Sequence, residues 1–309
     1  MNYKQIIENV LKNGQPKEAT RLDSNGNVVP VENATIGTFC EIFRHDMGQG
    51  FPLSTLRRMP FKPTCVELEG FIKGVTSKQW YKDRNCSYWN YWASPMAVKS
   101  FKEDSHSIDN HLGYSIERHK KIQEECDDLG ECFYAGSWRG FHDPNGYADE
   151  SVDQINELVK ILKTSPYNRR MVVTSWNPLG TDYTALHWCH HSFTVCVYGN
   201  KLNLAWDQRS CDLLINQTIV TYGLLLLLLC EESGLEPGEL SGRFIDCHIY
   251  ENQLDAAKEL VKREEKDLPQ VKIKRKEDGS FSIFDWTYED VELINYNPHP
   301  KMNMGAVTV

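Results

Sequence analysis

The sequence predicts an α+β domain, in which strands and helices are mixed without regular alternation. Three segments in the second half alternate apolar and polar residues as half-buried strands do: residues 169–177, 191–199 and 201–210. Residues 218–233 are almost continuously apolar and stop at Gly234, which predicts a buried helix. At 309 residues and 40% hydrophobic content, the chain is long enough for one large domain or two modest ones.

The first third of the chain predicts two helices and an irregular connection. Residues 3–13 predict a helix that ends at Gly14, and residues 64–73 predict a second helix that ends at Gly74. Between them, residues 16–35 are rich in Asn, Gly, Pro and Val, which predicts a loop or a short hairpin around residues 24–27. The polar stretch at about 93–131 predicts a surface insertion that contains a helix.

The second half of the chain predicts most of the sheet. The Tyr198-Gly199-Asn200 link is a hairpin signal between two of the predicted strands. Residues 242–250 predict a further strand, and residues 251–264 predict the helix that follows it. Two more strands are predicted at 269–275 and around 281–290. We find no internal repeat and no low-complexity linker.

Charge and composition exclude several classes of protein. A formal net charge of -9 argues against general nucleic-acid binding, which needs a basic surface. The longest apolar run, residues 224–230, is far below the roughly 20 residues of a membrane span. The N-terminus lacks the pattern of a signal peptide, and the ten cysteines follow no disulfide or CxxC spacing. We therefore expect a cytoplasmic protein with reduced thiols and no membrane contact.

Cys189 stands apart from the other cysteines because of its neighbours. It precedes a predicted strand, is followed by His190 and His191, and has Arg209 on the next strand of the hairpin. Cationic neighbours lower the pKa of a thiol and make it a nucleophile. A buried structural thiol is the alternative. A zinc site built from Cys189, His190, Cys247 and His248 is another, but adjacent strand residues point to opposite faces, so we expect no metal.

Two further groups of polar residues have the chemistry of a ligand site. Arg169 and Arg170 precede a strand and Arg209 ends one, and a guanidinium group at such a place suits an oxyanion. Surface salt bridges are the alternative for each arginine alone. His248 and Tyr250 lie two residues apart on one strand face, where they could bind one sugar hydroxyl or simply form a buried pair.

Together these segments resemble the thymidylate synthase family over nearly the whole chain. The matching motifs occur in order: IENVLKNGQPK at 7–17, GFPLSTLRR at 50–58, YWNYWA at 88–93, NRRMVVTSWN at 168–177, CH at 189–190, DQRSCDL at 207–213, GRFIDCHIYENQ at 242–253 and YNPHPKMNM at 296–304. The resemblance implies one catalytic domain over residues 1–309 with a three-layer α/β fold. Its large mixed sheet is expected to pack against the same sheet of a second copy in a homodimer.

The resemblance also implies an activity and its substrates. Cys189 would attack C6 of a pyrimidine nucleoside monophosphate, and C5 would then accept a one-carbon unit from 5,10-methylenetetrahydrofolate. Glu67 would manage protons at the 4-position of the base, and Tyr134 would assist loss of the C5 proton. The other implied contacts are Arg209, Ser210, Arg21 and, across the dimer, Arg169 and Arg170 for the phosphate; His248 and Tyr250 for the sugar; and Asp212, Trp89, Trp92 and Leu186 for the folate, with Asp212 also at the nucleotide.

Several departures from the family pattern bear on the base and the product. The uracil-reading asparagine should lie four residues before Tyr222, where this chain has Thr218; a single hydroxyl cannot donate and accept at once as an amide does. Asn216 lies near enough to restore that amide. The segment between Asp212 and Tyr222 is about two residues shorter than the family pattern, so the folate site must differ.

Two more positions differ, and the choice of reaction follows from all of them. Trp188 replaces the usual proline, and either Arg21 or Asn33 holds the N-terminal phosphate-binding position. We therefore expect hydroxymethylation of dCMP or CMP. Reductive methylation of dUMP, as in thymidylate synthase itself, is the main alternative. Hydroxymethylation of dUMP and methylation of a cytidylate are further alternatives. A nucleotide-binding relative without catalysis is the alternative from another class.

Overall fold

The computed structural model describes residues 1–18, 20–22, 28–30, 34–94, 126–144, 146, 150–215 and 217–304. Most of the predicted insertion at 93–131 therefore lies outside the described residues, as do Asn33 and Asn216. The backbone of Arg21 is described but its side chain is not.

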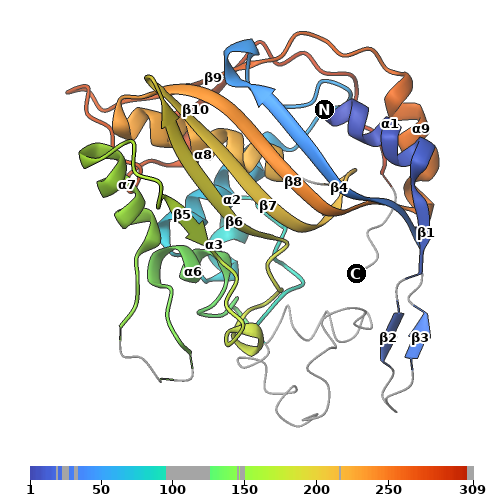
Figure 1. Cartoon of the computed structure of the whole chain (residues 1–309), viewed down its shortest axis with the longest axis horizontal. Helices are drawn as coiled ribbons and strands as arrows, with labels where there is room; N and C mark the ends of the chain where they lie inside the picture. The colour runs from blue at the N-terminus through green and yellow to red at the C-terminus, as the bar shows by residue number, and fades with distance from the viewer. Residues whose placement is uncertain are drawn as a thin grey trace.

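A six-stranded mixed sheet forms the centre of the molecule (Figure 1). Its strand order is β1-β4-β8-β7-β6-β5, and all neighbours are antiparallel except the parallel pair β7 and β8. The bounds are β1 Gln15–Lys17, β4 Thr35–Asp46, β5 Val172–Thr174, β6 His190–Tyr198, β7 Lys201–Asp212 and β8 Glu236–Tyr250. The predicted α+β class is confirmed, and so is the hairpin at Gly199, which has a left-handed φ of 61°.

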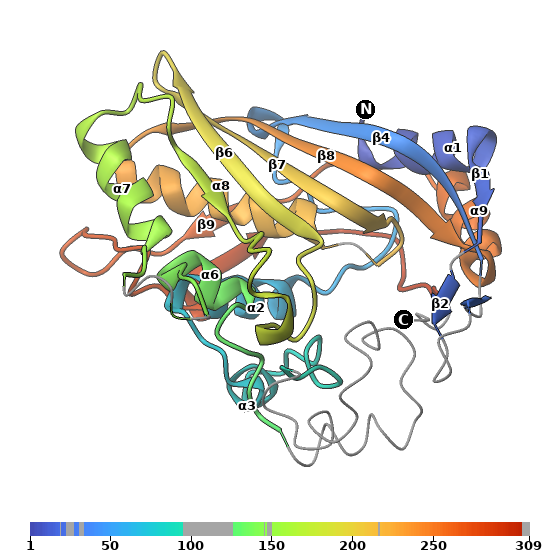
Figure 2. The same ribbon diagram turned by 60° about the horizontal axis from the view of Figure 1, so that its bottom comes forward.

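Helices cover one face of this sheet along most of its length (Figures 1 and 2). They are α2 Phe61–Lys73, α6 Tyr134–Gly140, α7 Gln154–Thr164 and α8 Thr218–Ser233. Helix α8 is buried on nearly all sides, as its continuous apolar sequence predicts. Helices α1 Tyr3–Asn13 and α9 Leu254–Lys262 pack together at the end of the sheet where β1 joins β4. The short helix α3 spans Lys78–Asp83.

The opposite face of the sheet carries exposed apolar side chains. Val172 pairs with Thr194, and Thr194 pairs with Ala205, so one row of small and apolar residues crosses β5, β6 and β7. Val172 is 53% exposed, and Tyr198, on the same face of β6, is 75% exposed. A face of this composition suits contact with another protein surface more than contact with water.

Some elements differ from the sequence predictions. The strand predicted at 169–177 is only Val172–Thr174, whereas β8 begins at Glu236, several residues earlier than predicted. The strand predicted around 281–290 is wrong. There Thr287 donates from its backbone N–H and hydroxyl to the Asp290 carboxylate, which closes the 3-10 turn Tyr288–Asp290, and the strand β10 follows at Val291–Ile294, paired with β9 Gln270–Ile273.

The remaining elements are short or were not predicted. Strands β2 Thr20–Leu22 and β3 Val28–Pro30 pair antiparallel on either side of residues 24–27, which confirms the hairpin alternative for this segment. Strand β4 and helix α7 were not predicted. Single turns of 3-10 helix occupy Met47–Gln49, Thr181–Tyr183 and Glu251–Gln253. None of the described helices is both long and apolar enough to cross a bilayer.

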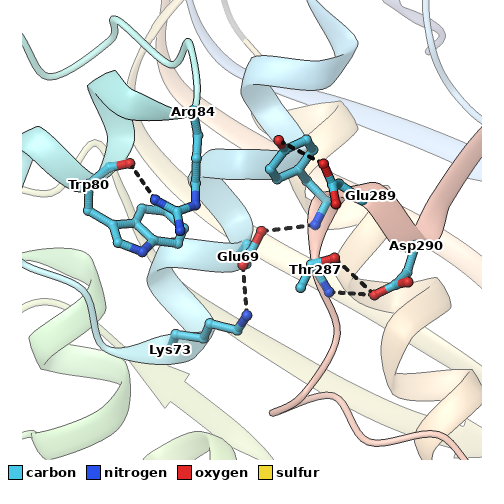
Figure 3. A network of polar contacts seen from close by, with 8 residues as sticks. Glu69, Lys73, Trp80, Arg84, Thr287, Glu289 and Asp290 are labelled. Carbon is cyan, nitrogen blue, oxygen red and sulfur yellow. Dashed lines mark hydrogen bonds and ion pairs between the residues drawn. The ribbon is translucent and has the colours of Figure 1, made fainter. Parts of the chain in front are cut away.

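A buried carboxylate ties helix α2 to the C-terminal part of the chain (Figure 3). Glu69, 2% exposed, accepts one hydrogen bond from Lys73 Nζ at 2.7 Å and another from the backbone N–H of Tyr288 at 2.9 Å. Because a buried charge is tolerated only when it is paired, Glu69 fixes the position of the segment after residue 287. The same helix carries Glu67, so this contact also positions the candidate site.

Replacing Glu69 by glutamine is expected to destabilise the fold by about 2 kcal/mol. The amide can accept from Lys73 or from Tyr288, but its NH2 group then faces the other donor. Urea unfolding at neutral pH measures the loss. Glu289→Gln, at an exposed carboxylate in the same region, serves as the control and should change stability by less than about 0.5 kcal/mol. Equal effects of the two variants would show that the Glu69 contacts do not stabilise the fold.

Candidate active site

Cys189 lies directly before β6. Arg209 of β7 donates hydrogen bonds to the backbone carbonyl groups of Cys189 and of the two residues before it. The backbone N–H of Arg209 donates to Cys189 O at 2.8 Å, and its guanidinium donates to the carbonyl groups of His187 and Trp188, both at 3.0 Å. Arg209 Nη2 is then 4.0 Å from Cys189 Sγ. The structure thus brings together the thiol and the arginine that the sequence placed on neighbouring strands.

Burial and the arginine act on the Cys189 thiol in opposite directions. Burial raises the pKa of Cys189, and the charge of Arg209 lowers it by less, so the pKa lies above its ordinary value. The expectation that the cationic neighbours of Cys189 bring its pKa below the ordinary value is therefore wrong. The thiol is the resting form, and attack on a substrate requires that its proton leave.

The histidines beside Cys189 are not the cationic neighbours that the sequence suggested. Burial lowers the pKa of His190 to about 3, and His191 adds to that effect. His190 Nδ1 lies 3.0 Å from the hydroxyl of Tyr222, and its ring stacks on Tyr134 with centroids 4.2 Å apart. His190 is therefore a neutral ring packed between two tyrosines at pH 7.

Two contacts attach residues 188–189 to the start of helix α6 and to Cys132, which precedes it. The backbone N–H of Cys189 donates to the Tyr134 hydroxyl at 2.7 Å. Trp188, fully buried at the position where the family pattern has proline, donates its indole N–H to Cys132 O at 2.9 Å. A proline would restrain the backbone here through its ring. The tryptophan lacks that ring and instead holds the segment through the hydrogen bond of its indole. The Tyr134 hydroxyl therefore lies beside the backbone of Cys189.

Glu67 is a buried carboxyl group with a strongly altered pKa. Burial raises its pKa to about 7, and a hydrogen bond from the Trp89 indole N–H, 2.9 Å from Oε1, lowers it by less. A carboxyl group of this pKa can both give and take a proton at neutral pH. Trp89 is itself buried and packs edge-on against Phe133 with ring centroids 4.5 Å apart. Its contact with Glu67 was not predicted from the sequence.

A second cluster lies where β7 and β8 run side by side. Asp212 is the register neighbour of His248, and Ser210 is the neighbour of Asp246. Asp212 accepts from the Leu214 backbone at 2.9 Å and from Gln253 Nε2 at 3.2 Å, and burial raises its pKa.

The His248 and Tyr250 rings meet edge-on in this cluster, with centroids 5.3 Å apart. The prediction that they share a strand face is therefore confirmed. His248 Nδ1 also lies 3.6 Å from the Asp246 carboxylate, and this contact is the main reason why the pKa of Asp246 falls to about 2, with Lys17 adding to the effect.

Thr218 is connected to the site by a hydrogen bond to Gln208, a residue that was not among the predicted site residues. Thr218 begins α8, is buried, and donates its hydroxyl proton to Gln208 Oε1 at 2.7 Å. Gln208 is the register partner of His190 on β6. The alternation of β7 could have indicated it, because Gln208 shares a strand face with Ser210 and Asp212.

The other predicted residues are two exposed arginines and two partly buried side chains. Arg169 and Arg170 are exposed before β5 and form no ion pair within the described part of the chain. Trp92 and Leu186 are partly buried and pack against the core. Among the described residues, no three His, Cys, Asp or Glu side chains lie close enough to hold a metal ion.

Residues 1–308 match the sequence model of the family described as thymidylate synthase. This range contains both clusters and the two exposed arginines.

Proposed function

The chain belongs to the thymidylate synthase family, and from this premise we propose that Cys189 is the covalent nucleophile of a folate-dependent C5 transferase acting on a pyrimidine nucleoside monophosphate. The observation that carries the proposal is the position of the thiol, with the Arg209 guanidinium 4.0 Å from its sulfur and Tyr134 bonded to its backbone. As the S–C6 bond forms, the thiol proton passes to solvent and an electron pair of the C5–C6 double bond moves toward C5, which becomes the carbon nucleophile.

Glu67 and Tyr134 are proposed to manage the protons of this reaction. Because the pKa of Glu67 is about 7, the carboxyl group can protonate the substituent at C4 while the adduct forms and recover the proton later. Tyr134 is proposed to assist loss of the proton from C5, since its hydroxyl is held beside the nucleophile.

Arg209 and Ser210 are proposed to bind the nucleotide phosphate, together with Arg21. Arg209 is held in place by two carbonyl groups, and its fixed positive charge would stabilise a dianionic phosphate beside it. His248 and Tyr250 are proposed to bind the sugar 3′-hydroxyl. Asp212, Trp89, Trp92 and Leu186 are proposed to bind the reduced folate, because a carboxylate and apolar side chains suit the pterin ring. The folate supplies the one-carbon unit when bound.

A homodimer is proposed to complete the phosphate site. Arg169 and Arg170 are exposed at the edge of the sheet and have no ion-pair partner in the described part of their own chain. The exposed face with Val172 and Tyr198 lies on the side away from the helices and offers an apolar surface for a second copy. In such a dimer each chain would supply its two arginines to the other chain's site.

The proposed product is a hydroxymethylated cytidylate. Thr218 stands where the family pattern has a uracil-reading amide, and the segment after Asp212 is shortened. After the one-carbon unit is attached, its bond to the folate nitrogen would break and leave an exocyclic methylene on C5. Hydride from the released tetrahydrofolate would give a methyl group and dihydrofolate, whereas addition of water would give a hydroxymethyl group and leave tetrahydrofolate. In both cases the S–C6 bond breaks as the product forms, which frees Cys189. A reshaped folate wall admits water more readily, which favours the second outcome. Methylation of dUMP is the second candidate, favoured by the retained site residues.

Product masses test this proposal directly. The protein is incubated with methylenetetrahydrofolate and, separately, CMP, dCMP, UMP and dUMP. We expect a hydroxymethylated cytidylate and no rise in dihydrofolate absorbance. A methylated dUMP product accompanied by dihydrofolate would refute the hydroxymethylase assignment while leaving the covalent mechanism intact.

A further inference from the structure

The hydroxyl group of Thr218 is already a hydrogen-bond donor within the protein. Its Oγ1 lies 2.7 Å from Gln208 Oε1, and both side chains are buried. A hydroxyl group has a single proton. A threonine that gives this proton to an amide oxygen therefore meets any other polar group as an acceptor.

The orientation of the Gln208 amide is determined by two neighbours that each have only one possible role. The indole N–H of Trp206 can only donate, and it lies 3.4 Å from Gln208 Oε1. The backbone carbonyl of Ser210 can only accept, and it lies 2.9 Å from Gln208 Nε2. A reversed amide would place two donors together at Trp206 and two acceptors together at Ser210. The amide oxygen must therefore face Thr218.

Trp206 is itself held in place by close packing. Its ring lies against Gly242, where an added Cβ would come within 2.3 Å of the ring. It also stacks on Tyr222 with centroids 5.0 Å apart and an interplanar angle of 17°. Because neither contact leaves room for the indole to turn, the donor that orients Gln208 is fixed.

The Thr218 hydroxyl belongs to the same group of residues as the nucleophile. Gln208 pairs with His190 across β6 and β7, and His190 directly follows Cys189. One turn after Thr218 on α8, the Tyr222 hydroxyl contacts His190 Nδ1 at 3.0 Å. A base whose C6 is bonded to Cys189 is therefore bordered by this part of α8.

We propose that Gln208 is a positioning residue that makes Thr218 an acceptor for the 4-amino group of a cytosine base. The inference rests on the proposed function, because it concerns the base bound at that site. Cytosine carries an amino donor at C4, whereas uracil carries a carbonyl acceptor there, and two acceptors repel. The one base donor of uracil, N3–H, is a ring group and not the substituent at C4.

Nucleotide affinities measured without folate test this inference. Calorimetry gives the dissociation constants of CMP, UMP, dCMP, dUMP and a ribonucleoside monophosphate of 2-pyrimidinone, which lacks the 4-amino group. The wild type is expected to bind cytidylate about tenfold more tightly than uridylate or the deaminated analogue. Thr218→Val should remove this preference by weakening cytidylate alone, whereas Thr218→Ser, which keeps the hydroxyl, should retain it.

A second variant separates positioning from a structural role. Gln208→Met releases the Thr218 proton, so the hydroxyl can donate to uracil O4, and uridylate affinity is expected to rise by about tenfold. General damage to the site would lower every affinity instead. Thr221→Val is the matched control: it removes a buried hydroxyl of the same helix that donates to Gln217 O at 3.2 Å, and it should leave the base preference unchanged.

The possible outcomes are distinct. A wild type that prefers uridylate, or a cytidylate preference that survives Thr218→Val, would overturn the inference while leaving the covalent mechanism in place. If no pyrimidine nucleotide binds at all, the proposed function fails and the inference fails with it.

Discussion

Cys189→Ala is expected to reduce turnover by at least about 10⁴-fold while nucleotide binding survives. In the proposed mechanism the Cys189 sulfur forms the bond to C6, so the loss should appear in kcat. Binding should survive because Arg209 is held by the backbone carbonyl groups of His187 and Trp188, which the substitution leaves in place. Product formation and nucleotide affinity are measured on the same preparation.

Covalent trapping provides the control for this variant. A 5-fluoropyrimidine nucleotide with methylenetetrahydrofolate should give a stable mass adduct on the wild type and none on Cys189→Ala. Cys196→Ala, at a partly exposed thiol on β6, should retain the adduct. Turnover that persists in Cys189→Ala would show that the nucleophile is assigned wrongly. The absence of an adduct with any pyrimidine in the wild type would favour a nucleotide-binding protein without catalysis.

Glu67→Gln is expected to lower kcat by about 10²–10⁴-fold, because the amide cannot exchange a proton. It should also make the protein more stable at alkaline pH. Burial raises the pKa of Glu67 from 4.5 to about 7. Ionising the carboxyl in the folded protein is therefore unfavourable, whereas the neutral amide can still accept the Trp89 hydrogen bond.

The sign of the pH effect on stability follows from proton binding. Between pH 4.5 and about 7 the unfolded chain has lost the Glu67 proton while the folded protein keeps it. Stability of the wild type therefore falls as pH rises through this window, by a total of about 3 kcal/mol from this group. Below pH 4.5 both states are protonated and the group contributes nothing.

Urea unfolding of both proteins at about pH 5 and about pH 8 measures this difference. The stability of Glu67→Gln relative to the wild type should rise between the two pH values. Glu289→Gln controls for the loss of one exposed negative charge. A relative stability of Glu67→Gln that stays constant with pH would contradict the raised pKa.

The sequence by itself determined the elements whose signal is local. The apolar run of α8, the alternation of β6 and β7 and the glycine between them depend only on neighbouring residues, and all are present. The strand predicted around 281–290 failed because a local capping contact between Thr287 and Asp290 competes with the extended conformation. The ordered motifs determined the family, and with it the identity of Cys189, Glu67 and Arg209 as candidates.

Only the tertiary structure decided the state of these groups. Burial depends on what packs around a side chain, so the sequence could not show that Cys189 rests as a thiol, that His190 is neutral, or that Glu67 titrates near neutral pH. Likewise, a threonine in a sequence has a hydroxyl of undetermined direction. The contacts of Gln208 with Trp206 and Ser210 give that hydroxyl its direction, because they join residues that meet only when the sheet and helix α8 have packed together.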